Sequence, residues 1–138
     1  DSQAPLHVYG RTRYEGELAI AELPEEYFIV RIAWVFGVAG KNFIKTMLRL
    51  GREKGAVSVV DDQVGSPTYT YDLARLLTDM VQTEHYGHYH ATNEGECSWY
   101  EFACEIFRQA GMPEVKVTPV TSEMFAAKAK RPANSRMD

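Results

Sequence analysis

Hydrophobic and polar residues along the chain follow two periodicities, one typical of buried strands and one typical of amphipathic helices. The stretch Tyr27–Gly37 is apolar and rich in β-branched residues, broken only by Arg31, which predicts a strand covered on both faces. From about Asn42 to Lys54, apolar residues recur at helical spacing and cations gather near the C-terminal end, where they complement the helix dipole. The pattern therefore predicts a strand, a glycine-containing loop and a helix.

The rest of the chain continues this alternation. Ser98 and Glu101 form a capping box that opens a helix, and Gly111 is a suitable residue to end it. The other predicted helices are Val8 to about Glu22, Tyr71 to about Thr83, and Thr121 to Lys128; the other predicted strands are Ala56–Val60, His88–Thr92 and Val115–Val120. Repeated alternation of strands and helices predicts an α/β fold with parallel pairing.

Composition narrows the class of protein. At 138 residues, with 45% hydrophobic and 25% charged residues, the chain has the size and balance of a single globular unit. No apolar run approaches the roughly 20 residues of a spanning helix, so no membrane association is expected. The net charge of −4 argues against a general nucleic-acid binder. Cys97 and Cys104 form no recognisable disulfide framework, which favours a reducing cytoplasm.

Tyr9 and Arg13 are the first candidates for chemistry. Their separation of four residues places both side chains on one face of the predicted helix. A phenol beside a cation is a workable acid–base pair, because the cation favours the phenolate. The spacing alone is commonplace, so an exposed surface pair is the alternative interpretation.

Other polar clusters give weaker signals. His85, His88 and His90 lie close in sequence, but no carboxylate or cysteine completes a metal-binding spacing, and we predict no metal site. Asp61 and Asp62 are more typical of a solvated turn than of an acid–base pair.

Six segments, in this order, resemble the dTDP-4-dehydrorhamnose reductase family of the extended short-chain dehydrogenase/reductase superfamily. They are VYGRTRYEGE, VRIAWVFG, KNF, DDQVGSPTYTYDLA, HYHATNEGECSWYEFACEIF and KRPANSRMD. The resemblance runs from about Pro5 to Asp138 and implies the second half of an NAD(P)-binding Rossmann-like fold. It further implies that about residues 1–55 end the Rossmann-like part, with the tyrosine helix, and that about residues 56–138 form mainly a small substrate-binding lobe.

The resemblance also implies roles for single residues. Tyr9 falls on the tyrosine that protonates the C4 oxygen of the substrate, and Arg13 on a position normally held by a lysine that contacts the nicotinamide ribose. Trp34 matches a tryptophan that packs against the deoxysugar. Asn42 and Gln63 are candidates for hydrogen bonds to the substrate or cofactor, and structural roles in turns are equally expected for both.

The expected activity is reduction of dTDP-4-dehydro-L-rhamnose to dTDP-L-rhamnose with NADPH or NADH. No G-x-x-G-x-x-G occurs, so the pyrophosphate-binding half is expected to be missing and the fragment alone to be inactive. The alternatives are another sugar-nucleotide epimerase or dehydratase of the superfamily, and a non-catalytic regulatory or binding subunit. Because the predicted strand Tyr27–Gly37 would lack its neighbours, self-association is also expected.

Overall fold

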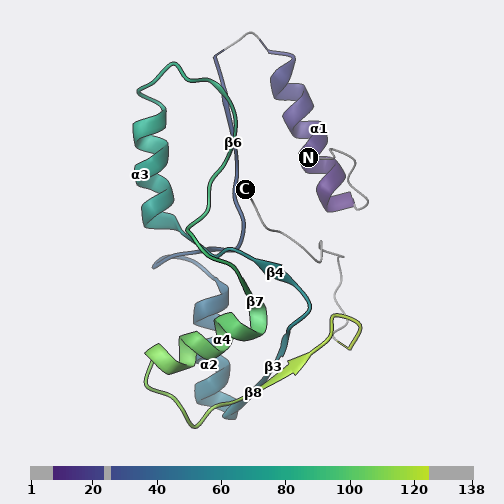
Figure 1. The fold of residues 1–138 in the computed structure, drawn as a ribbon, viewed down its shortest axis with the longest axis vertical. Coiled ribbons are helices and arrows are strands. Elements are labelled where there is room, and N and C mark those ends of the chain that lie inside the picture. The colour runs from purple at the N-terminus through teal and green to yellow at the C-terminus, as the bar shows by residue number, and fades with distance from the viewer. Residues whose placement is uncertain (1–7, 24–25, 125–138) are drawn as a thin grey trace.

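The computed structural model describes residues 8–23 and 26–124, which alternate between helices and short strands (Figure 1). In chain order they form α1 (Val8–Ala21), β1 (Phe28–Arg31), β2 (Val35–Phe36), α2 (Phe43–Lys54), β3 (Ala56–Val60), β4 (Val64–Gly65), β5 (Thr68–Tyr69), α3 (Thr70–Met80), β6 (Gly87–His90), β7 (Cys97–Ser98), α4 (Trp99–Gln109) and β8 (Lys116–Val120). None of the helices in this described part is long and apolar enough to cross a membrane.

The strands pair across long distances in sequence. Strand β1 pairs with β6, β2 with β5 and β3 with β8, all in parallel, whereas β4 and β7 pair antiparallel. Parallel neighbours require a crossover connection, which here carries helices. The predicted α/β class with parallel pairing is thus confirmed.

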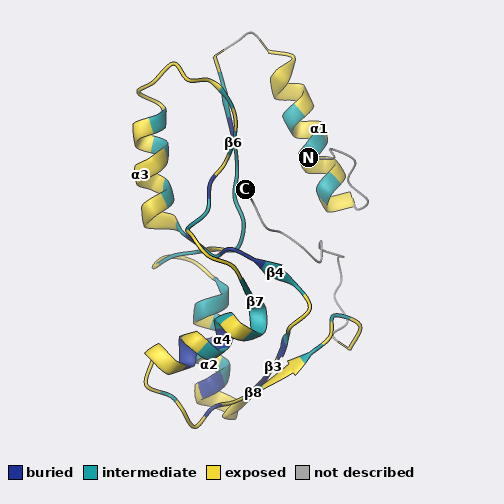
Figure 2. Ribbon diagram, viewed as in Figure 1, coloured by how far each residue is buried: buried dark blue, intermediate teal, exposed yellow. Residues whose placement is uncertain are grey.

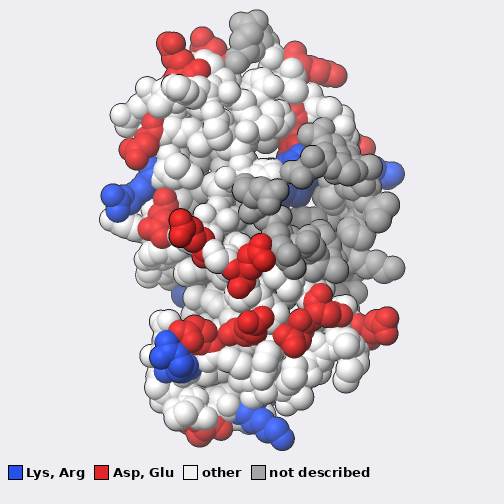
Figure 3. All heavy atoms as spheres, in the orientation of Figure 1, with Lys and Arg blue, Asp and Glu red and all other residues white. Residues whose placement is uncertain are grey.

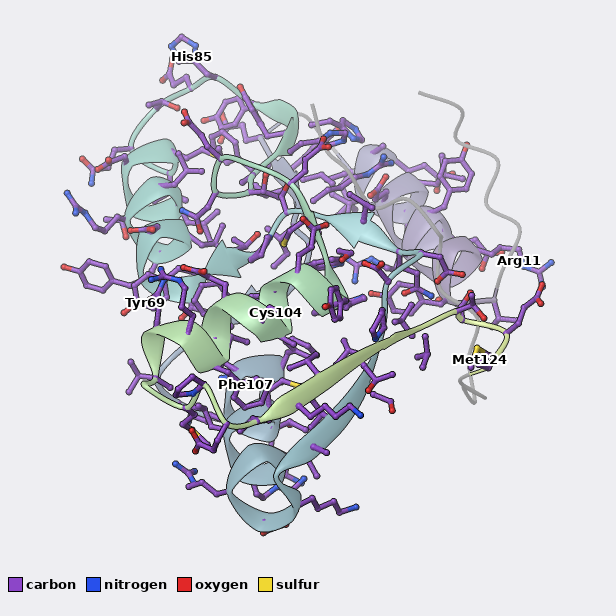
Figure 4. The ribbon with its side chains drawn as sticks, turned by 60° about the horizontal axis from the view of Figure 1, so that its bottom comes forward. Arg11, Tyr69, His85, Cys104, Phe107 and Met124 are labelled. Carbon is purple, nitrogen blue, oxygen red and sulfur yellow. The ribbon has the colours of Figure 1, made fainter. Side chains whose placement is uncertain are left out.

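The main hydrophobic core lies where α2 and α4 pack on β3 and β8, at the lower end of Figure 2. Figure 4 shows Phe107 on the side of α4 that faces α2. The buried members are Met47, Val57, Val59, Ala103, Ile106, Phe107 and Val115. Alternate residues of β3 are buried, as expected of a strand with one face on a core.

Polar caps set the ends of the two helices that form this core. The Asn42 side chain accepts a hydrogen bond from the backbone N–H of Lys45 and begins α2. The capping box of Ser98 and Glu101 is present as predicted, with both reciprocal bonds formed. After α4, Gly111 adopts a left-handed φ of 68° and ends the helix.

The prediction of one continuous strand over Tyr27–Gly37 is wrong. Strand β1 ends at Arg31, Trp34 takes a left-handed φ of 50°, and β2 then continues beside a different partner. The cause is Thr68, which is 2% exposed: its hydroxyl donates to the carbonyl of Ala33 at 2.6 Å and its backbone N–H to that of Trp34 at 3.0 Å. Of β1 only Ile29 is buried, so complete coverage of both faces is also not observed in this chain.

Two sequence predictions fall wholly or partly outside the described residues. Thr121–Met124 forms a turn, whereas the rest of the predicted helix to Lys128 is not described. The Arg131–Pro132 segment, which contributed to the family resemblance, also lies beyond the described range.

The contact between α2 and α4 yields a stability prediction. A Cβ added at Gly51 would lie 2.5 Å from a ring carbon of Phe107, closer than the core can accommodate without movement. We expect Gly51→Ala to lower the free energy of unfolding by about 1–3 kcal/mol, because overpacking outweighs the gain in helix propensity. Chemical denaturation measures the change.

Gly16→Ala in α1 is the matched control, because no described atom lies within 4 Å of the added group, and it should be neutral or stabilising. Equal effects of the two substitutions would contradict this explanation.

Candidate functional site

Three polar side chains form one ridge along α1. Tyr9, Arg13 and Glu17 follow each other at intervals of four residues, so they lie above one another on the same helix face. The Nη1 of Arg13 donates a hydrogen bond to the Tyr9 hydroxyl at 3.0 Å, and its guanidinium carbon lies 5.4 Å from the centre of the tyrosine ring. The prediction that Tyr9 and Arg13 share one helix face is confirmed. The geometry places a cation directly on the phenol oxygen.

Glu17, the third residue of this ridge, is bound by Arg31 of β1. The Nε and Nη2 of Arg31 donate to the two carboxylate oxygens at 2.7 and 2.5 Å, a bidentate pair whose side chains are 15% (Glu17) and 29% (Arg31) exposed. The hydrogen bond from Arg31 holds the pKa of Glu17 below its ordinary value, with smaller contributions from the charges of His88 and Arg13. The same bond raises the pKa of Arg31.

This ion pair is an important attachment of α1, because no residue of the helix is buried. Figure 2 shows α1 largely exposed along its length. Arg11, on another side of the helix, points away from the protein and pairs only loosely with Glu15, at 3.9 Å (Figure 4). The Glu17–Arg31 pair therefore joins the helix that carries the tyrosine to the β1–β6 sheet.

Trp34 lies in the loop between β1 and β2 and stacks on Trp99, the first residue of α4. The ring centres are 3.7 Å apart and the planes differ by 15°. Further aromatic rings extend this cluster: Phe36, Phe43 and Phe102. Trp34 is half-buried, so one aromatic side chain both contributes to packing and reaches the surface. Its left-handed backbone is a sparsely populated conformation for a bulky residue, of the kind that clusters at functional sites.

Asn42 and Gln63 are placed differently. Asn42 uses both ends of its amide within the protein, since its Nδ2 donates to the carbonyl of Gly37 at 2.8 Å while its oxygen caps α2. Gln63 is half-buried in the loop between β3 and β4. Trp34, Asn42 and Gln63 thus follow the carboxyl ends of β1, β2 and β3, the ends at which α/β proteins bind ligands.

The two aspartates after β3 are held by hydrogen bonds. Asp61 accepts from the hydroxyl of Ser98 at 2.6 Å. Asp62 accepts from the backbone N–H and the hydroxyl of Ser122, and the backbone bond is the main cause that lowers the pKa of Asp62. These contacts fit the predicted turn role, because they join the loop to the start of α4 and to the turn after β8.

No group of three or more potential metal ligands occurs among the residues with described positions. His88 and His90 lie on one exposed face of β6, because residues two apart in a strand point to the same side. Figure 3 shows Asp and Glu side chains gathered across the middle of the face in view. In the described part of this face, Lys and Arg are scattered and form no comparable cluster.

Sequence reasoning found the tyrosine–arginine pair but missed the residues that hold it. Glu17 lies on the same helix ridge, and Arg31 is the charged residue that breaks an otherwise apolar strand, so both carried a signal. Thr68 and Trp99 carried no comparable signal, because their roles depend on contacts between distant segments.

Comparison with known proteins places this geometry in context. The family described as RmlD substrate binding domain matches residues 1–138. A dTDP-4-dehydrorhamnose reductase of Aggregatibacter actinomycetemcomitans is 41% identical over 145 residues, covering 97% of this chain and 49% of the relative. The crystal structure of dTDP-4-dehydrorhamnose reductase from Bacillus anthracis in complex with NADP is 49% identical, with a TM-score of 0.94 over 98% of this chain and 48% of that one. A reductase structure from Clostridium acetobutylicum is 47% identical, also with a TM-score of 0.94, covering 100% of this chain and 49% of that one.

The chain spans about half the length of the curated relatives it matches, 49% in the first and 47% in another. The likeness to solved structures, with TM-scores of 0.94, confirms the prediction that the chain forms the second half of a Rossmann-like, extended short-chain dehydrogenase/reductase fold.

The Glu17–Arg31 pair makes the attachment of α1 sensitive to acid. Because the pKa of Glu17 is lower in the folded chain than its ordinary value of 4.5, the pair stabilises α1 above that pH, and this stabilisation is lost as the pH falls through the folded pKa. We expect Glu17→Gln to lower the free energy of opening of α1 by about 1 kcal/mol at about pH 7 and by much less at a pH below the folded pKa of Glu17. Amide hydrogen exchange of α1 measures this difference.

Glu15→Gln is the matched control on the same helix, because the Glu15 side chain is 65% exposed and only loosely paired. It should leave the protection of α1 nearly unchanged at both pH values. An effect of Glu17→Gln that is equally large in acid would contradict the assigned role of its carboxylate.

Proposed function

The chain belongs to the RmlD substrate binding domain family, and from this premise we propose that it is part of a dTDP-4-dehydrorhamnose reductase. The whole protein would reduce dTDP-4-dehydro-L-rhamnose to dTDP-L-rhamnose with NADPH or NADH, in the biosynthesis of a polysaccharide precursor. The observation that carries the proposal is the hydrogen bond from Arg13 to the Tyr9 hydroxyl, in a chain whose relatives are named as reductases.

The proposed mechanism assigns proton transfer to Tyr9. Its hydroxyl donates a proton to the C4 oxygen of the substrate, and the guanidinium of Arg13 stabilises the phenolate that forms. A bound dinucleotide would supply the hydride. Of the five N–H donors of a guanidinium, the bond to Tyr9 uses one, so Arg13 keeps donors for the proposed contact to the nicotinamide ribose.

The proposed substrate contacts lie on the loops after β1, β2 and β3. The proposed contact of Trp34 with the sugar is supported by its half-buried indole. Trp99 covers one face of this indole, and the backbone of Trp34 is held in a strained conformation. Asn42 and Gln63 stay candidates for polar contacts. Since the amide of Asn42 is already engaged at both ends, its proposed role is to hold the loop from Gly37 to Asn42 in place beside the substrate.

Two further aspects are part of the proposal. A substrate-binding lobe from about residue 56 is supported by the core around β3, α4 and β8, although α2 before that boundary packs into the same core.

A cytoplasmic location is supported by two cysteines, Cys97 and Cys104, that are both free thiols, as expected in a reducing compartment.

A non-catalytic binding subunit is the second candidate, and the observation that favours it is Arg13 itself. Where the family resemblance expects lysine, this chain presents a planar guanidinium that is bulkier and directs its donors differently. The two candidates differ in one measurable property, turnover of the nucleotide sugar.

We therefore expect activity from a chimera that joins the N-terminal half of the Bacillus anthracis reductase to residues 1–138. Oxidation of NADPH in the presence of dTDP-4-dehydro-L-rhamnose measures turnover. In this chimera, Tyr9→Phe should lower kcat by a factor of about 10²–10⁴ with little change in KM, because the ring stays and the proton donor is lost.

The intact Bacillus anthracis enzyme is the positive control. A folded chimera that binds the substrate without turnover would support the binding-subunit candidate instead. Near-normal turnover after Tyr9→Phe would remove the catalytic assignment. Arg13→Lys then tests the cation: higher kcat would indicate that arginine is a misfit, and lower kcat that the site has adapted to it.

We also propose that the chain self-associates when produced alone. Apolar side chains on and after α1 are exposed, namely Val8 (72%), Leu18 (45%), Ile20 (40%) and Leu23 (62%). Among the described strands β1 pairs only with β6, which leaves one of its edges without a described partner. Light scattering should show a mass above that of one chain at high concentration. A monodisperse single-chain mass at millimolar concentration would refute the proposal.

A further inference from the structure

On the α1 ridge of Tyr9, Arg13 and Glu17, both the phenol and the carboxylate are within reach of the Arg13 guanidinium. Arg13 lies between Tyr9, one turn before it, and Glu17, one turn after it. A cation and a carboxylate at this spacing on a helix surface are close enough to form an ion pair. An unpaired Glu17 would thus attract Arg13 more strongly than a neutral phenol does, because two full charges interact.

Arg13 nevertheless donates to Tyr9. The structure offers a reason: Arg31 donates hydrogen bonds to both carboxylate oxygens of Glu17, at 2.7 and 2.5 Å. A carboxylate satisfied by a bidentate guanidinium has its charge compensated and its best acceptor directions filled. The groups whose charges act on Glu17 come from three elements: Arg31 from β1, His88 from β6 and Arg13 from its own helix.

We propose that Arg31 is a positioning residue for the reaction, acting through Glu17 to keep the guanidinium of Arg13 on the hydroxyl of Tyr9. Arg31 lies in β1, a different element from the helix that carries Tyr9 and Arg13, and its two described hydrogen bonds both go to Glu17. When Arg31 is lost, Glu17 captures Arg13, and the phenol loses the cation that stabilises its ionised form. This inference rests on the proposed function for its kinetic consequence, but its structural consequence does not depend on that function.

The structural test uses the 138-residue chain with Arg31→Met, which keeps an unbranched apolar stem and removes the guanidinium. A crystal structure of this variant is expected to show Arg13 within 4 Å of the Glu17 carboxylate and no longer bonded to Tyr9. Arg13 still bonded to Tyr9 beside an unpaired Glu17 would overturn the proposal, whatever the activity of the whole protein.

The kinetic test uses the chimera described above and depends on a rescue. Arg31→Met should lower kcat about tenfold or more with KM changed less than about twofold, and adding Glu17→Gln should restore most of the loss, because no carboxylate then competes for Arg13. A merely structural bridge predicts the opposite, since the double variant lacks the bridge as well. Arg11→Met, which removes an exposed arginine from the same helix, should leave kcat unchanged.

Failure of the double variant to recover would overturn the proposal. If the single variant does not fold, as judged by circular dichroism, Arg31→Lys takes its place, because one ammonium leaves a carboxylate oxygen open to Arg13 and a partial, rescuable loss is expected. A chimera inactive even with the wild-type segment would count against the proposed function alone, and the structural test would still decide the role of Arg31.

Discussion

Parallel pairing between segments far apart in the sequence is the constraint on which the rest of the structure depends. Strand β1 finds its partner in β6, and β3 in β8, so the chain must return to the same end before each pair can form. The helices lie on these return paths and cover the strands, which builds the core around α2 and α4. Trp34, Asn42 and Gln63 each lie in the loop after the carboxyl end of one strand of these parallel pairs, β1, β2 and β3.

Local sequence signals predicted what depends on near neighbours. Helical periodicity located α1 to α4, and the capping box at Ser98 marked the start of α4 to the residue. The break after β1 could not be read in this way, because it is imposed by Thr68, which lies 35 positions from the carbonyl that its hydroxyl binds. Apolar composition predicts burial, but it contains no information on which strand is the partner of which.

In the candidate site, too, contacts between near neighbours were predictable and contacts between distant segments were not. The pair of Tyr9 and Arg13 was predictable because it is contained within one helical turn. The carboxylate–guanidinium bridge between Glu17 and Arg31 spans 14 positions and two elements, and periodicity alone could not join them. Helix α1, which has no buried residue, is thus joined to the sheet by charges, whereas α2 and α4 are positioned by apolar packing.

The stacked indoles of Trp34 and Trp99 have an optical consequence. These two residues are the only tryptophans among the 138, and their ring centres lie 3.7 Å apart. All indole absorption and emission therefore originates from one contact, between the strained loop after β1 and the first turn of α4. Two chromophores at this distance couple, so their near-ultraviolet circular dichroism and their mutual quenching report on a single geometric relation. These signals therefore report on the contact between the loop after β1 and the start of α4 without any added label.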